Sequence, residues 1–188
     1  DWAMFFGDKA FYFLPCLKAM QINKFFINTN WAAFLTSFFY YFYRKMYLVG
    51  AILLSMFVIS YVPMVYVVFE YLKDAYAANG MTALMSIDVN AFMSFTQAYE
   101  GLLTFSSAAR NIAFLSTAVL SVFANKIYFK TAESKIKALR EKYKNDRDYS
   151  QSLAKHGRTS TLAVILVAVC IVVAFIASSN LMVFLLIK

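Results

Sequence analysis

Three apolar runs, each long enough to cross a lipid bilayer, constrain this chain more than any other feature. They cover residues 46–72, 102–125 and 161–187. The hydrocarbon core of a bilayer is about 30 Å thick, and about 20 helical residues cross it. The runs do not alternate between apolar and polar residues, as the strands of a membrane barrel do. Each run is therefore predicted to be a helix, which satisfies its own backbone hydrogen bonds inside lipid.

The composition points to the same class of protein. Of all residues, 62% are hydrophobic and 15% are charged, whereas soluble domains have about 45–50% and about 25%. Five glycines and two prolines leave little room for a loop-rich β fold. We therefore predict an all-α integral membrane protein with three transmembrane helices.

A short aromatic segment, residues 31–43, precedes the first span. Its 13 residues cover about 20 Å as a helix, which is less than the apolar thickness of a bilayer. Asn30 is a good N-cap for such a helix, and aromatic side chains prefer the membrane interface. The segment is predicted to be an interfacial helix, a re-entrant helix or a short span. We favour a segment that dips into the bilayer and returns, which keeps residues 1–30 on the same side as Arg44 and Lys45.

The distribution of lysine and arginine orients the spans, because these residues stay on the cytoplasmic side near span ends. Ten of them lie in residues 126–158, whereas residues 74–101 contain none. Loop 126–158 is therefore predicted to be cytoplasmic, and loop 74–101 is predicted to be periplasmic. The residues expected to anchor the topology and the interface are Trp31, Arg44 and Lys45.

These signals give a domain organisation. Residues 1–30 are predicted to form an N-terminal cytoplasmic or interfacial segment, and residues 31–188 are predicted to form the membrane domain. Within the membrane domain, residues 73–101 form the periplasmic loop. Residues 126–160 form a basic cytoplasmic helical hairpin, with a polar, loop-like stretch at 145–160.

Arg110 interrupts the second apolar run. A charge inside a membrane span is costly and is usually paired or functional. Glu70 and Glu100 are the candidate partners for an intramembrane polar pair with Arg110, and Asp74 and Ser178–Asn180 are further candidates. Either such a pair locks helices together, or Arg110 lines an ion or transport path.

A candidate partner-docking surface lies on the basic helix that follows the second span. Four side chains on it fall at helical spacing on one face, and we call them the docking stripe. The docking stripe consists of Phe129, Ile136, Leu139 and Tyr143. The alternatives are a solvated cytoplasmic face and a contact with anionic lipid headgroups.

Local signals predict several helix ends. Pro15 suits the first position of a short helix over residues 15–21. The pair Asn79-Gly80 is typical of a helix C-cap, and Asp88 is typical of the N-cap of the next helix.

No catalytic or cofactor-binding pattern occurs in the sequence. His156 is the single histidine and has no cysteine or acidic cluster beside it. A metal site would require such neighbouring ligands. There is no phosphate-binding loop and no nucleophile turn, and the membrane topology accounts for the positive charge without nucleic acid. We predict that the protein is not an enzyme, carries no cofactor and binds no nucleic acid.

Five short sequence motifs give the chain a family resemblance. They are Phe13-Leu14-Pro15, then Asn30-Trp31-Ala32-Ala33-Phe34 with Tyr43-Arg44-Lys45-Met46-Tyr47, and finally Phe123-Ala124-Asn125-Lys126-Ile127-Tyr128 with Gly157-Arg158-Thr159-Ser160. In order and spacing they resemble a bacterial family of small multi-pass membrane proteins that is catalogued only as a domain of unknown function. Members of that family often carry Gly-Pro where this chain has Thr36-Ser37. The resemblance implies a location in the bacterial inner membrane and brings no activity with it.

These observations lead to a functional hypothesis. The chain is expected to be a non-catalytic accessory or scaffold subunit of a larger bacterial inner-membrane complex. Its expected partners are membrane lipids and other membrane subunits, with a homo-oligomer as a further possibility. The alternative is a small oligomeric channel or transporter component with Arg110 on its path.

Overall fold

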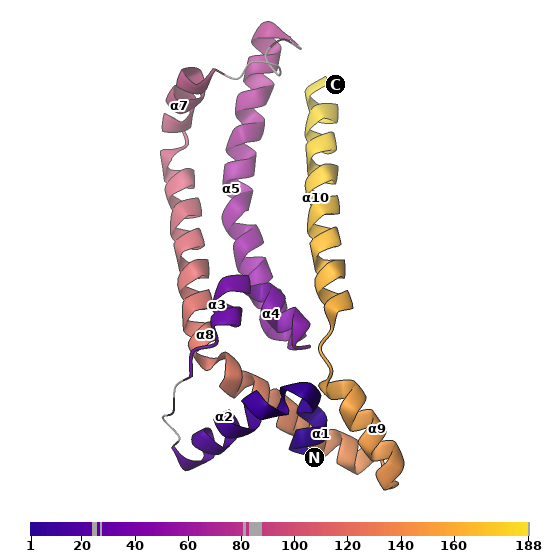
Figure 1. Ribbon diagram of the computed structural model, residues 1–188. Helices are drawn as coiled ribbons and strands as arrows, with labels where there is room; N and C mark the ends of the chain where they lie inside the picture. The colour runs from indigo at the N-terminus through magenta and orange to yellow at the C-terminus, as the bar shows by residue number, and fades with distance from the viewer. Residues whose placement is uncertain (24–25, 27, 81, 83–87, 188) are drawn as a thin grey trace. The chain divides into compact units, whose positions relative to one another are not determined.

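The computed structural model describes residues 1–23, 26, 28–80, 82 and 88–187, and every regular element in that part of the chain is a helix (Figure 1). The all-α prediction is thereby confirmed. Within these described residues, three helices are long and apolar enough to cross a membrane, as predicted. They are α5 (Tyr47–Asn79), α8 (Glu100–Lys142) and α10 (Thr161–Ile187).

The contacts of the chain divide it into two compact units. Unit 1 comprises residues 1–51 and 116–165, and unit 2 comprises residues 52–115 and 166–188. Residues 1–30 therefore do not form a separate structural unit. The described residues of this segment pack in unit 1 with residues from the first part of the membrane domain and from the basic hairpin.

Unit 1 begins with α1 (Trp2–Phe6), a 3₁₀ turn η1 (Gly7–Lys9) and α2 (Ala10–Ile22). The prediction that a helix starts at Pro15 is wrong, because α2 starts at Ala10 and Pro15 lies inside it. Phe13 explains the earlier start. It is buried, and its ring centroid lies 5.1 Å from that of Tyr128. Such tertiary packing overrides the weak local preference that proline expresses.

The aromatic segment forms two short helices rather than one. They are α3 (Trp31–Thr36) and α4 (Phe38–Tyr43), and they are separated by Ser37. Ser37 has φ 48° and ψ −128°, a backbone conformation that suits glycine and that a residue with a Cβ rarely adopts. The predicted N-cap is confirmed, because the Asn30 side chain accepts a hydrogen bond of 3.1 Å from the Ala33 N–H.

The segment runs out along α8 and comes back. The Asn30 N–H donates to the Ser121 carbonyl at 3.0 Å, and the Ser37 hydroxyl lies 3.2 Å from that of Thr117. The return places the Tyr40 hydroxyl 2.8 Å from Asn30 Nδ2. Tyr40 of α4 thus lies beside Asn30, at the start of α3. The segment is therefore a helical hairpin with Ser37 at its tip.

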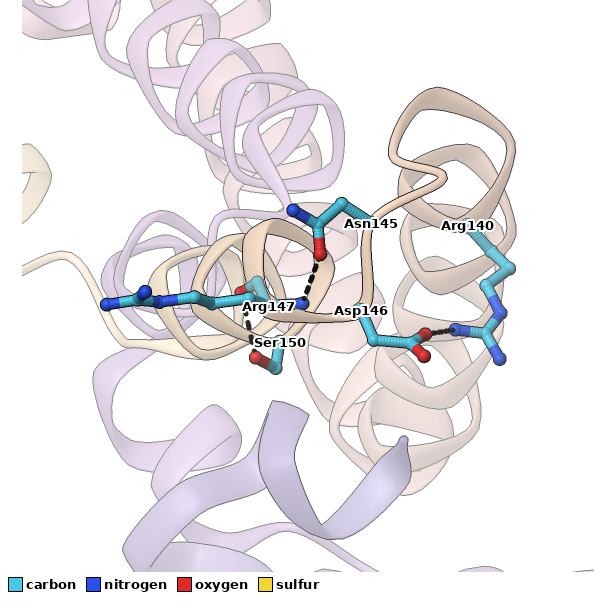
Figure 2. A network of polar contacts seen from close by, with 5 residues as sticks. All are labelled: Arg140, Asn145, Asp146, Arg147 and Ser150. Atoms are coloured by element: carbon cyan, nitrogen blue, oxygen red, sulfur yellow. Dashed lines mark hydrogen bonds and ion pairs between the residues drawn. The ribbon is translucent and has the colours of Figure 1, made fainter.

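The polar stretch at 145–160 is mostly helical, so the loop prediction for it is wrong. Helix α9 spans Asp146–Gly157, and Asn145 Oδ1 caps it by accepting a 3.1 Å bond from the Arg147 N–H (Figure 2). Tyr149 and Leu153, four residues apart, are both buried. The cap and this apolar pair are visible in the sequence, but the polar composition around them favoured a loop in the prediction.

The turn between α8 and α9 is also held by side chains. Arg140 of α8 bonds to Asp146 at 3.2 Å (Figure 2), and its guanidinium lies 4.6 Å from the centroid of the Tyr149 ring. Both contacts bring the start of α9 against the end of α8. The predicted helical hairpin is thus present in residues 126–157 as α8 and α9.

Gly157 allows α9 to approach α1 at backbone distance. A Cβ on Gly157 would overlap the Phe5 carbonyl oxygen. The end of α9 therefore meets the backbone of α1 directly, and only a residue without a side chain fits there.

Unit 2 is organised by small polar residues and aromatic pairs. Ser106 of α8 donates to the Ser60 carbonyl of α5 at 2.6 Å, and both serines are buried. Small side chains of this kind let membrane helices approach closely. Elsewhere along the same two helices, the rings of Phe57 and Phe114 meet edge to face at 5.3 Å.

The predicted helix ends in unit 2 are confirmed. Helix α5 ends at Asn79, and Gly80 follows with φ 61°. Asp88 caps α7 (Val89–Gln97) by accepting bonds from two backbone N–H groups. Two aromatic side chains of α7 then pack on Tyr71 of α5.

The strain at Ser37 gives a first prediction. Ser37→Gly and Ser37→Ala both remove the hydroxyl contact with Thr117, but only glycine adopts the observed φ without cost. The glycine variant is therefore expected to have a free energy of unfolding about 1 kcal/mol higher than the alanine variant. Denaturant unfolding in detergent measures the difference. Equal stability of the two variants would contradict the strained backbone conformation at Ser37.

The close approach at Gly157 gives a second prediction. Gly157→Ala forces α9 away from α1 and is expected to lower the free energy of unfolding by about 2 kcal/mol or more. Gly101→Ala is the matched control, because a Cβ there meets no atom within 4 Å and alanine favours the helix. Thermal unfolding in detergent should show a lower midpoint for the first variant and an unchanged or higher one for the second.

Candidate functional site

The predicted intramembrane pair does not form among the described residues. The guanidinium of Arg110 lies 5.8 Å from the centroid of the Tyr61 ring, and no ion pair within 4.0 Å joins it to a described carboxylate. Glu70 bonds to Lys73 at 3.5 Å instead. Glu100 is exposed at the start of α8. The structure therefore gives Arg110 an aromatic neighbour in place of an acidic one.

The polar group Ser178–Asn180 is not a partner for Arg110 through its serines. Both serine hydroxyls donate to the Phe175 carbonyl within α10, at 2.8 and 2.9 Å. Such back-bonding satisfies a hydroxyl inside its own helix.

The docking stripe is divided by the structure. Phe129 and Leu139 are buried inside the chain, whereas Ile136 and Tyr143 are partly exposed. Phe129 packs against the N-terminal helices, with its ring 5.8 Å from that of Phe6 and 5.9 Å from that of Phe13. The sequence pattern identified the apolar face of the helix correctly, but the chain covers half of that face itself.

A groove of about 620 Å³ remains along the stripe. Its apolar lining comes from Phe129 and Ile136 of α8 together with Trp2 and Leu17 of the N-terminal helices. Its polar lining consists of Asp1, Gln21, Lys130, Glu133 and Lys137. We call this the stripe groove, and sequence reasoning missed it because four of its nine lining residues come from a segment more than 100 residues away.

The predicted anchor Arg44 lies within an aromatic cluster of unit 1. Its guanidinium carbon is 4.7 Å from the ring centroid of Phe13, 5.1 Å from that of Tyr128 and 5.7 Å from that of Tyr43. Cation–π contacts of this kind stabilise a charge without a carboxylate. Trp31, another of the predicted anchors, is 68% exposed on α3.

Lys45 ties the turn between α4 and α5 to the end of α9. Its ammonium donates to the carbonyls of Lys155 and His156 at 3.2 and 3.4 Å, and Lys135 donates to the carbonyl of Lys45 at 3.2 Å. Burial and the neighbouring Lys155 charge lower the pKa of Lys45. Burial and the Lys45 charge likewise lower the pKa of Lys135.

A buried polar network holds the helical hairpin on α8. Asn30 Nδ2 donates both to Asn125 Oδ1, at 2.9 Å, and to the Tyr40 hydroxyl, at 2.8 Å. All three residues are less than 10% exposed. Each asparagine belongs to a sequence motif noted above, but their pairing across 95 residues has no signature in either motif.

The described part of the chain contains no group of three or more His, Cys, Asp or Glu residues that could hold a metal ion. Protein-family models, curated proteins and solved structures were compared with the chain, and none of them matches.

Two adjacent tyrosines give a test of the polar network. Tyr40→Phe removes an acceptor of Asn30 and is expected to lower the free energy of unfolding by about 1–2 kcal/mol. Tyr41→Phe is the matched control, because the Tyr41 hydroxyl is buried and has no partner. Its removal should leave stability unchanged or raise it, so a larger loss in the Tyr41 variant would refute the role given to Tyr40.

Proposed function

We propose that this protein is a non-catalytic accessory or scaffold subunit of a larger bacterial inner-membrane complex. The observation that carries the proposal is the stripe groove. Its apolar floor and charged rim have the composition of a protein-binding surface, in which apolar side chains occupy the centre and polar ones the edge. A partner segment with apolar side chains on one face and charged side chains of both signs at its edges would fit the groove.

The organisation of unit 1 supports docking on the cytoplasmic side. Residues 1–30, the Arg44-Lys45 turn and the basic α8–α9 hairpin all belong to this unit. The helical hairpin at residues 31–43, whose two ends are close together, supports a segment that dips into the bilayer and returns. With the positive charges facing the cytoplasm, the stripe groove faces it as well.

The alternative function is a small oligomeric channel or transporter component. Arg110, a charged residue in an apolar helix with no described carboxylate paired to it, is the specific observation in its favour. Arg110→Ala should abolish flux through reconstituted vesicles if Arg110 lines a path, and should leave a scaffold subunit's partners in place.

Gentle detergent extraction at native expression level, followed by mass determination of the particle, distinguishes the two functions. Other proteins in a fixed ratio to this chain would establish an accessory subunit. A particle that contains only copies of this chain would contradict the accessory role and favour the channel.

A charge placed in the stripe groove tests docking directly. Ile136→Asp puts a carboxylate among the apolar side chains of the groove. It is expected to weaken binding of the partner at least about tenfold, which corresponds to about 1.4 kcal/mol. Ala138→Asp is the control, since it places the same charge on an exposed site of the same helix outside the groove. Leu139 is unsuitable for this test because it is buried.

Quantitative co-purification of the partner with each variant gives the measurement. Equal recovery of the partner with the wild type and with both variants would contradict docking at the stripe groove.

A further inference from the structure

Unit 1 gathers cations from three separate segments. The turn between α4 and α5 contributes Arg44 and Lys45, α8 contributes Lys135, and the end of α9 contributes Lys155 and Arg158. Hydrogen bonds of 3.2 Å to backbone carbonyl groups connect Lys135 to Lys45 and Lys45 to Lys155. Arg44, Lys135 and Arg158 line one recess, together with Thr131, His156 and Thr159. We call it the cationic recess.

No described carboxylate is paired with these cations. The three ion pairs in the described ranges join Lys73 to Glu70, Lys137 to Glu133 and Arg140 to Asp146. Like charges brought together at a partly buried site repel one another. The lowered pKa of Lys45 and of Lys135 has burial and a neighbouring lysine as its causes. An anion at this place would relieve that repulsion.

Arg44 adds a guanidinium charge to this group of cations, and the hydroxyls of Tyr40 and Tyr128 accept hydrogen bonds from it. Aromatic rings lie close to its guanidinium, which is a planar group whose N–H bonds point outward in its plane. Its Nε is buried and has no hydrogen-bond partner. A buried donor without a partner costs about 1–3 kcal/mol.

The cationic recess adjoins the start of the apolar helix α10. Thr159 lines it, and the next residue, Ser160, caps α10 by accepting a 3.2 Å bond from the Ala163 N–H. Ser160 also donates its backbone N–H to the Tyr43 carbonyl at 2.8 Å. If α10 crosses a membrane, its first residues lie at the level of the lipid headgroups.

We propose that the cationic recess binds a phosphate group, which Lys135 and Arg158 hold and which the positive charge of Arg44 also attracts. Arginine and lysine form strong charge-assisted hydrogen bonds with phosphate oxygens. As the side chains stand, the recess has no space for a water molecule, so the phosphate sits at its mouth, where Arg158 is exposed. The headgroup of an anionic phospholipid and free inorganic phosphate share this chemistry.

The test uses the full chain in a neutral detergent. Dioleoylphosphatidylglycerol, dioleoylphosphatidylcholine and inorganic phosphate are added separately, and bound lipid is counted by native mass spectrometry while thermal unfolding is followed. The site variant is Lys135→Gln with Arg158→Gln. Its matched control is Lys142→Gln with Lys144→Gln, which removes the same charge from exposed positions outside the recess.

Phosphatidylglycerol is expected to bind the wild type and the control, and to bind the site variant at least about tenfold more weakly. A stabilising shift with inorganic phosphate that disappears in the site variant would also support the site and identify free phosphate as its ligand. Should the site variant fail to fold, Arg158→Gln alone, at an exposed position, is expected to weaken binding at least about threefold. The proposal is overturned if neither anion binds or if phosphatidylcholine binds as well as phosphatidylglycerol. It is also overturned if the control variant loses as much binding as the site variant or, where that does not fold, as Arg158→Gln.

Discussion

The buried contact of Asn30 with Asn125 and Tyr40 is the interaction on which unit 1 depends. An amide removed from water must find hydrogen-bond partners, because an unpaired buried amide destabilises the fold. Here one amide group meets α8 and α4 together while its oxygen caps α3. This arrangement fixes where the helical hairpin starts, where it returns and which part of α8 it follows.

The positions of the cations follow from that arrangement. Because the helical hairpin returns to its starting point, Arg44 and Lys45 come out beside α8 and the end of α9. Aromatic rings then stabilise Arg44, and backbone carbonyls accept bonds from Lys45 and Lys135. Neither kind of partner neutralises charge as a carboxylate does, so unit 1 keeps a strong preference for an anion near the start of α10.

The sequence predicted the parts of the fold that depend on local patterns. The helical class, the three apolar helices and the caps at Asn30, Gly80 and Asp88 all follow from residue type and spacing. Prediction was wrong at Pro15 and at residues 145–160, where the burial of Phe13, Tyr149 and Leu153 outweighed local composition. The docking stripe shows the same limit, since periodicity locates an apolar face but does not say what covers it.

By itself, the sequence determined which segments are helical and which are apolar enough to cross a membrane, because hydropathy and helical period are properties of neighbouring residues. Only the tertiary structure decided that Asn30 pairs with Asn125, that Arg110 meets Tyr61 rather than Glu70 or Glu100, and that the N-terminal helices complete the stripe groove. Such pairings are set by packing and by the need to satisfy buried polar groups between segments far apart in the chain, and no local pattern records them.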